Sequence, residues 1–251
     1  MRRLKRDFPY YAGDPVPVSG VGWSVVAAAC ALGFVVLVST PWLLTRLAPG
    51  FSGMSQGLAV AGFVLIPLIG LALASGRQWT ALVAPPQWRD VLVGLAFVPV
   101  VWVTSFAFAS IILKTSATSA NPALAMLASS GWPERAVFLA STAPQLFGEE
   151  LVTVLPFLAI LAMLHTRLNV PRRVAIVLAW LGSAILFGAM PLQTYDWHLV
   201  QALGGIGAIR LVLTLPYLIT RSIWASTITH VLNDWSLFFV GIAIHDLGAG
   251  Q

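Results

Sequence analysis

The chain has 251 residues, of which 58% are apolar and only 9% are charged, whereas a typical soluble domain has about 25% charged residues. Fourteen basic and nine acidic residues give it a net charge of +5. A surface this poor in charge excludes a cytosolic enzyme, a nucleic-acid-binding module and a disordered segment. The composition predicts an all-α, polytopic bundle of transmembrane helices whose basic residues meet lipid rather than nucleic acid.

Hydropathy divides the chain into a tail and seven predicted spans. Residues 1–21 form a basic, turn-rich tail, which we interpret as cytoplasmic and uncleaved because the apolar run after it is too long for a signal peptide. An eighth helix near residues 120–133 is the alternative count. The fourth span is expected to be broken by Pro144 and Pro156. The spans are expected at 22–45, 54–75, 90–113, 136–164, 173–190, 199–220 and 222–243.

These spans suggest how the chain is organised. Residues 22–135 would form an N-terminal part of three membrane helices, residues 136–243 a membrane core, and residues 244–251 a short tail. Cys30 lies within the first apolar run and is expected to be a small buried side chain; as the single cysteine, it cannot form an internal disulfide.

The basic residues predict the orientation of the bundle. With the N-terminus inside, the basic residues that lie outside the membrane on the outer side are only Arg46, Lys114 and Arg135. A bias of this kind is typical of multi-pass membrane proteins, and a bacterial plasma membrane is the expected location. The basic residues on the inside are Arg2, Arg3, Lys5, Arg6, Arg77, Arg89, Arg167, Arg172, Arg173 and Arg221.

Five charged or imidazole side chains fall in the interior of predicted spans, away from their ends: Glu149 and Glu150 in the fourth, Arg210 in the sixth, and His230 and Asp234 in the seventh. On insertion scales, a charged group at membrane depth costs ~2.5–3.5 kcal/mol, and such residues generally serve function. A structural ion pair between helices is the alternative interpretation, and Arg210 could instead extend to the lipid interface.

Helical geometry suggests which of these side chains can point to the same place. Neighbouring glutamates point about 100° apart, so only one of them can aim at a given spot. His230 and Asp234 are four residues apart and share a helix face, with Asn233 close to it. Arg210 is the expected counter-ion, first for Glu150 or Glu149 and then for Asp234.

Three segments carry a family resemblance: GEELVTVLPF, SAILFGAMPLQTYDWHLVQAL and ITHVLNDW, in that order. Over residues 136–243 the chain resembles the CPBP family of intramembrane proteases, also called the CAAX protease and bacteriocin-processing (Abi) family. The glutamate pair and the third motif, His230 with Asp234, are complete, and Phe187 matches the second motif. The family's first-motif arginine falls at Val154 and its second-motif histidine at Pro191.

The resemblance implies an intramembrane endopeptidase that cuts a membrane-tethered peptide or protein with a glutamate-activated water. Glu149 would then be the general base, Glu150 its partner or that of Arg210, and His230 the oxyanion donor, held by Asp234 or Asn233. His198 could reach back toward the site if the loop after Pro191 folds over it. Zinc bound by Glu149, Glu150 and His230 is a weaker alternative, since no HExxH sequence is present.

Two other functions stay open. The first is an inactive member of the same fold that binds a partner in an immunity or scaffold role, which Pro191 and Val154 favour. The second is a proton-coupled transporter, which the intramembrane charges would suit but which the lack of an internal repeat disfavours. The loop aromatics Tyr195 and Trp197 are expected to be interfacial anchors.

Overall fold

In the computed structural model, residues 8, 18–47, 54–119 and 121–249 are described, and all regular elements among them are helical. Short 3-10 or π-helical stretches follow α2 and α5, and a π-helical turn over Val200–Ile206 leads into α7. The helices are α1 Gly20–Leu47, α2 Ser55–Ser75, α3 Trp88–Thr115, α4 Pro122–Ser129, α5 Trp132–Ala162, α6 Arg172–Ala189, α7 Gly207–Thr220 and α8 Ile223–Ala249.

Seven helices of the described chain are long and apolar enough to cross a membrane. This confirms the predicted all-α polytopic bundle. The helix predicted as an alternative near residues 120–133 is α4. It has eight residues and is therefore about 12 Å long, too short for a hydrocarbon core of about 30 Å. Asn121 caps its first turn by accepting a hydrogen bond from the backbone N–H of Ala123 at 2.9 Å.

The prediction that prolines break the fourth span was wrong. Helix α5 runs without interruption through both Pro144 and Pro156, because backbone groups in lipid must be bonded internally and a helix is the way to do so. It begins at Trp132, where Pro133 and Glu134 form a favourable first turn. Helix α8 continues to Ala249, six residues beyond the predicted end of the last span.

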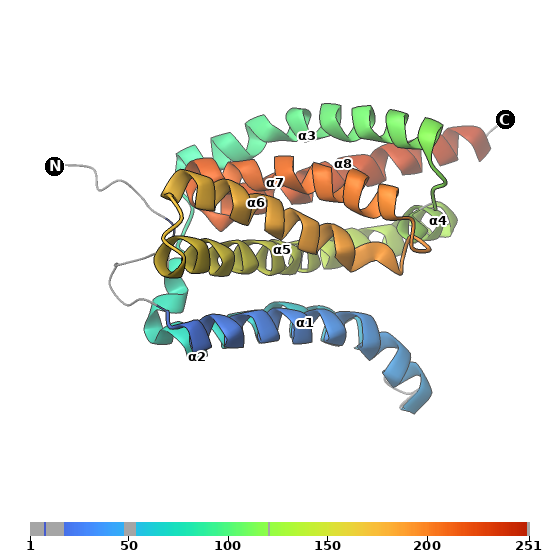
Figure 1. Ribbon diagram of the computed structural model, residues 1–251. Helices are drawn as coiled ribbons and strands as arrows, with labels where there is room; N and C mark the ends of the chain where they lie inside the picture. Colours follow the sequence, from blue (N-terminus) through green and yellow to red (C-terminus); the bar gives the residue numbers. More distant parts are fainter. Residues whose placement is uncertain (1–7, 9–17, 48–53, 120, 250–251) are drawn as a thin grey trace.

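Helix α5 lies at the centre of the arrangement (Figure 1). Helices α1 and α2 form a pair that packs on one side of α5, while α6 and α8 contact it from the other side. Helix α3 packs against α7 and α8. Helix α8 packs against both α5 and α7, so the three helices that carry the predicted site residues lie together.

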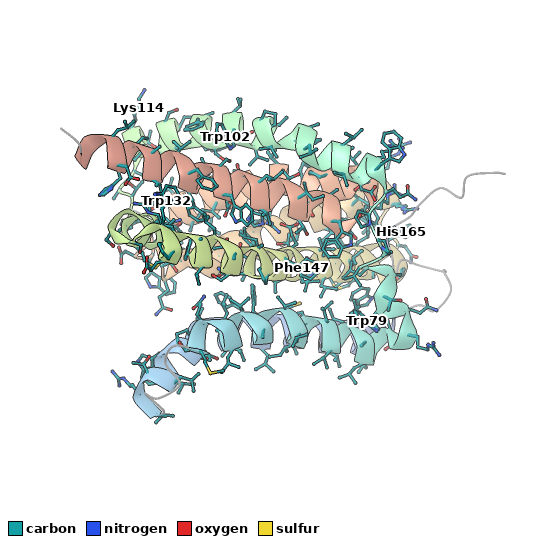
Figure 2. All side chains as sticks on the ribbon, turned by 180° about the vertical axis from the view of Figure 1, so that it is seen from behind. Trp79, Trp102, Lys114, Trp132, Phe147 and His165 are labelled. Carbon is teal, nitrogen blue, oxygen red and sulfur yellow. The ribbon has the colours of Figure 1, made fainter. Side chains whose placement is uncertain are left out.

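Aromatic and charged side chains mark the two ends of the bundle. Figure 2 shows Lys114 and Trp132 at one end and Trp79 and His165 at the other. Between them, Trp102 of α3 donates a hydrogen bond to Ser236 of α8 at 2.7 Å. Aromatic residues are typical of the two interfaces of a membrane, so this pattern agrees with helices that span it.

Small residues bring helices close together on both sides of the site. A Cβ atom at Gly148 of α5 would lie 2.6 Å from the ring of Phe63 of α2, and one at Gly94 of α3 would lie 2.8 Å from the carbonyl oxygen of Ala225 of α8. Thr229 adds a bond across the second contact, donating to the Gly94 carbonyl at 2.8 Å. Close backbone approach through small residues is the usual way in which membrane helices associate.

Candidate active site

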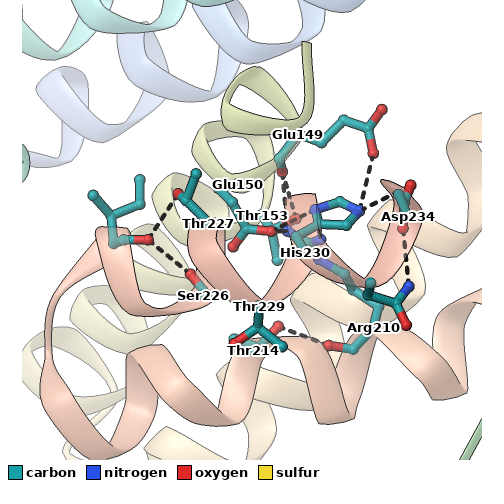
Figure 3. A network of polar contacts seen from close by, with 12 residues as sticks. Glu149, Glu150, Thr153, Arg210, Thr214, Ser226, Thr227, Thr229, His230 and Asp234 are labelled. Carbon is teal, nitrogen blue, oxygen red and sulfur yellow. Dashed lines mark hydrogen bonds and ion pairs between the residues drawn. The ribbon is translucent and has the colours of Figure 1, made fainter. Parts of the chain in front are cut away.

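Five ionisable side chains from three helices converge inside the bundle (Figure 3). Glu149 and Glu150 come from α5, Arg210 from α7, and His230 and Asp234 from α8. The imidazole of His230 lies between the three carboxylates in this view. The acid and imidazole groups predicted on the fourth and seventh spans therefore share one site.

The inner half of the site is a dry ion pair. Nη2 of Arg210 lies 2.8 Å from Oε1 of Glu150, and both side chains are fully buried. The guanidinium also stacks on the ring of Phe187, 4.2 Å from its centroid, and donates to the backbone carbonyl of Glu149 at 3.1 Å. Arginine suits this position because its planar fork can bond to several acceptors and stack at the same time.

The contacts of His230 fix the protons on its ring. Nδ1 lies 2.8 Å from Oε1 of Glu150, which is ionised by its pairing with Arg210, so Nδ1 must carry the proton that it donates. Nη1 of Arg210 is also near Nδ1, at 3.2 Å, but two donors cannot bond to each other. Nε2 therefore points away from the ion pair and is the atom that can face a reactant.

The outer half of the site is the accessible one. Nε2 of His230 lies 3.8 Å from Oε2 of Glu149 and 3.8 Å from Oδ2 of Asp234. These two side chains are 20% and 28% exposed, whereas Glu150 is fully enclosed. A separation of 3.8 Å is too long for a direct hydrogen bond, but it lets one water molecule bond to the imidazole and to a carboxylate together.

Neighbouring polar groups hold the two accessible carboxylates. Gln145, one turn before Glu149, donates to its Oε1 at 3.3 Å, and Asn233 donates to Oδ1 of Asp234 at 2.9 Å. Thr153 donates to the backbone carbonyl of Glu149 at 2.8 Å. Gln145 was not among the site residues predicted from the sequence, although its i,i+4 spacing to Glu149 indicates such a contact.

Other predicted residues lie apart from this cluster. No contact in the described part of the chain joins the imidazole of His198 to the five ionisable groups, and its buried Nδ1 has no hydrogen-bond partner there. Val154 is fully buried in the apolar core. A guanidinium nevertheless reaches Glu150, because α7 supplies Arg210 from a distant part of the sequence.

The residues considered for zinc do not fit that role. Within the described residues, no three His, Cys, Asp or Glu side chains are arranged to hold a metal ion. Glu150 is already engaged by Arg210 and by Nδ1 of His230, which removes it from the set of Glu149, Glu150 and His230. Glu149 and His230 alone are too few for a catalytic zinc, which usually has three protein ligands.

Comparison with protein-family models matches residues 130–236 to the family described as type II CAAX prenyl endopeptidase Rce1-like. Residues 130–236 are therefore similar to this family. This confirms the resemblance to the CAAX protease family, over a segment that runs from just before α5 into α8 and contains all five ionisable groups of the site. Comparisons with curated proteins and with solved structures found no match.

Proposed function

We propose that this chain is an intramembrane endopeptidase of the CAAX or bacteriocin-processing type, acting on a membrane-tethered peptide or protein. The observation that carries the proposal is the division of the site into a buried ion pair, Glu150 with Arg210, and two accessible carboxylates that face Nε2 of His230. The Rce1-like match over the same helices supports it. A site that served only as a structural ion pair would not need the two accessible carboxylates beside His230.

Glu149 is the general base in this proposal. Its carboxylate takes a proton from a water molecule as the water oxygen attacks the carbonyl carbon of the amide. The proton then passes to the amide nitrogen as the C–N bond breaks, which leaves a carboxylic acid and an amine. Gln145 and Thr153 orient Glu149 for this step through their bonds to its carboxylate and its backbone.

His230 stabilises the developing oxyanion. With Nδ1–H donated to Glu150, the ring can donate a second bond from Nε2 only as the imidazolium. Three carboxylates against one guanidinium leave the site with negative charge that this cation offsets. One preorganised donor of this kind typically contributes ~2.7–4 kcal/mol to the transition state.

The test is cleavage of a membrane-tethered peptide by the purified protein in detergent. We expect Glu149→Gln to lower kcat at least about 100-fold, since it removes the base, and His230→Ala to act similarly. Glu134→Gln is the matched control: it makes the same change on an exposed residue of the same helix, and turnover should be unchanged.

Two outcomes would contradict the proposal. Undiminished turnover in both Glu149→Gln and His230→Ala would show that the cut is made elsewhere. Peptide binding without any turnover by the unmodified protein would instead favour the inactive relative, for which Pro191 in place of the family's histidine is the specific observation.

A further inference from the structure

One side chain from the N-terminal tail, Phe8, lies inside the bundle. It is 4% exposed and belongs to the main apolar core. Its ring meets the ring of Phe157 of α5 edge-on, with centroids 5.2 Å apart, and lies 5.5 Å from the ring of Tyr217 of α7. Phe157 and Tyr217 also meet each other edge-on, at 5.9 Å. The three rings therefore form one cluster that joins α5 and α7.

A cation near the turn between α7 and α8 holds Phe8 in this cluster. The guanidinium carbon of Arg221 lies 4.7 Å from the centroid of the Phe8 ring, a distance at which a guanidinium is attracted to an aromatic face. Arg221 ends α7 in the left-handed region, with a φ of 62°, and α8 begins at Ile223. Phe8 thus contacts α5, α7 and the turn that leads into α8.

The cluster lies on the same helix faces as the ion pair of the site. Phe157 is seven residues after Glu150, and Tyr217 is seven residues after Arg210. Seven residues make two helical turns, about 10 Å along the axis, and return to the same face. Helices α5 and α7 are therefore bridged twice at matching positions, by the ion pair and by the rings. The rings lie nearer to the end of the bundle that carries His165 (Figure 2).

Each helix lacks a backbone hydrogen bond between these two bridges. Pro156 directly precedes Phe157 in α5, and Pro216 directly precedes Tyr217 in α7. Proline has no N–H to donate to the preceding turn, so both helices are weakened between the site residue and the ring. Among the described helices, α5 and α7 each pack against α6 and α8 but not closely against each other. Their spacing therefore depends on the side chains that lie between them.

We propose that Phe8 is a positioning residue that sets the spacing of α5 and α7 and thereby holds the Glu150–Arg210 pair together. It acts through this pair and does not touch the reactants. Glu150 accepts the Nδ1 proton of His230, so the position of the pair also determines where Nε2 points. The effect of Phe8 on turnover rests on the proposed function, whereas its effect on helix spacing does not.

The first test measures the helix spacing directly and needs no turnover. Cys30 is replaced by alanine, and spin labels are attached to Met163→Cys and Ile219→Cys, two exposed positions at the ends of α5 and α7. Pulsed electron paramagnetic resonance then gives the distance between the labels. We expect this distance to shorten stepwise through Phe8→Leu, Phe8→Val and Phe8→Ala, because the helices close on the space that a smaller side chain leaves.

Phe239→Ala is the matched control for the label distances. It removes a phenyl ring that is 46% exposed on α8, and the distance should equal that of the labelled protein with Phe8 intact. A distance that does not follow the size of residue 8 would overturn the inference. The Phe8→Leu and Phe8→Val variants decide this even if Phe8→Ala does not fold.

The second test is a comparison of kcat and KM. Phe8→Ala should lower kcat by about 10- to 100-fold with little change in KM, because a displacement of about 1 Å at a catalytic site can cost about 100-fold in rate. Phe8→Leu, which keeps most of the apolar volume, should recover most of the turnover. Unchanged kcat in Phe8→Ala alongside an inactive Glu149→Gln would overturn the inference and leave the proposed function standing. If even the unmodified protein cuts no peptide, the proposed function fails and the label distances still decide the role of Phe8.

Discussion

Adjacent residues in one helix have separate environments in this site. Glu149 and Glu150 differ by one position, yet Glu150 is sealed against Arg210 while Glu149 is partly accessible beside Nε2 of His230. The 100° step between neighbouring helical residues produces this difference. One carboxylate can therefore anchor the imidazole while the other stays available for chemistry.

The ion pair leads to a prediction on stability. Arg210→Met leaves the buried Glu150 carboxylate without its cation and should lower the free energy of unfolding by about 3–5 kcal/mol. The double variant Glu150→Leu/Arg210→Met should lose much less than the sum of the two single losses, because no unpaired charge stays buried. Unfolding in detergent micelles measures both.

Arg46→Met is the matched control, since Arg46 is exposed at the end of α1, and its unfolding should be close to that of the unmodified protein. Simple additivity of the two single losses would mean that Arg210 and Glu150 do not act as a pair.

At the scale of helices, close contact between α2 and α5 sets the position of the glutamate pair. Gly148 directly precedes Glu149, and the ring of Phe63, which is fully buried, lies against it. Because both groups are enclosed, neither helix can shift without disturbing the other. Helix α2 lies outside the Rce1-like segment and yet supports the site through this contact.

Gly148→Ala tests this contact. The added methyl group would lie 2.6 Å from the Phe63 ring, and overpacking of this kind costs about 1–3 kcal/mol. We expect a lower melting temperature and lower turnover, because Glu149 moves with its neighbour.

Gly57→Ala on α2 is the control, since a Cβ there meets nothing within 4 Å and alanine favours a helix. Its stability should be equal to or slightly above that of the unmodified protein. Equal melting temperatures for Gly148→Ala and the unmodified protein would show that Phe63 yields without cost.

At the scale of the whole molecule, the helices alternate in direction, so that the α3–α4 loop and the α6–α7 connection meet at one end through Ser119 and Asp196. The segments after α2 and α5, with Trp79 and His165, lie at the other end (Figure 2). The bias of basic residues predicts that the second end faces the cytoplasm.

Single-cysteine labelling tests this orientation. The only natural cysteine, Cys30, is buried and can be replaced by alanine to remove background. A membrane-impermeant maleimide added to intact cells should label Ala117→Cys, in the loop between α3 and α4. Pro85→Cys, between α2 and α3 and also exposed, should react only after the membrane is permeabilised. The reverse pattern would invert the predicted topology.

The sequence by itself determined the fold class and the number of spans, because apolar runs of about 20 residues with few charges leave only helices that cross a membrane. It also indicated the ionisable residues of the site, since charges at membrane depth are conspicuous in an apolar sequence. The predicted break at the prolines of α5 was wrong because proline-containing helices stay continuous where every backbone hydrogen bond must be made within the protein.

Only the tertiary structure decided how these residues divide their roles. Arg210 is 60 residues from Glu150 in the chain, and nothing local says which glutamate it pairs with. The 2.8 Å contact forms because α5 and α7 both pack against α6 and α8. The partial exposure of Glu149 likewise depends on how α6 and α8 pack against α5. Which glutamate pairs with Arg210 and which one stays accessible depend on packing between segments that are far apart in the sequence. The local sequence around each residue does not determine either.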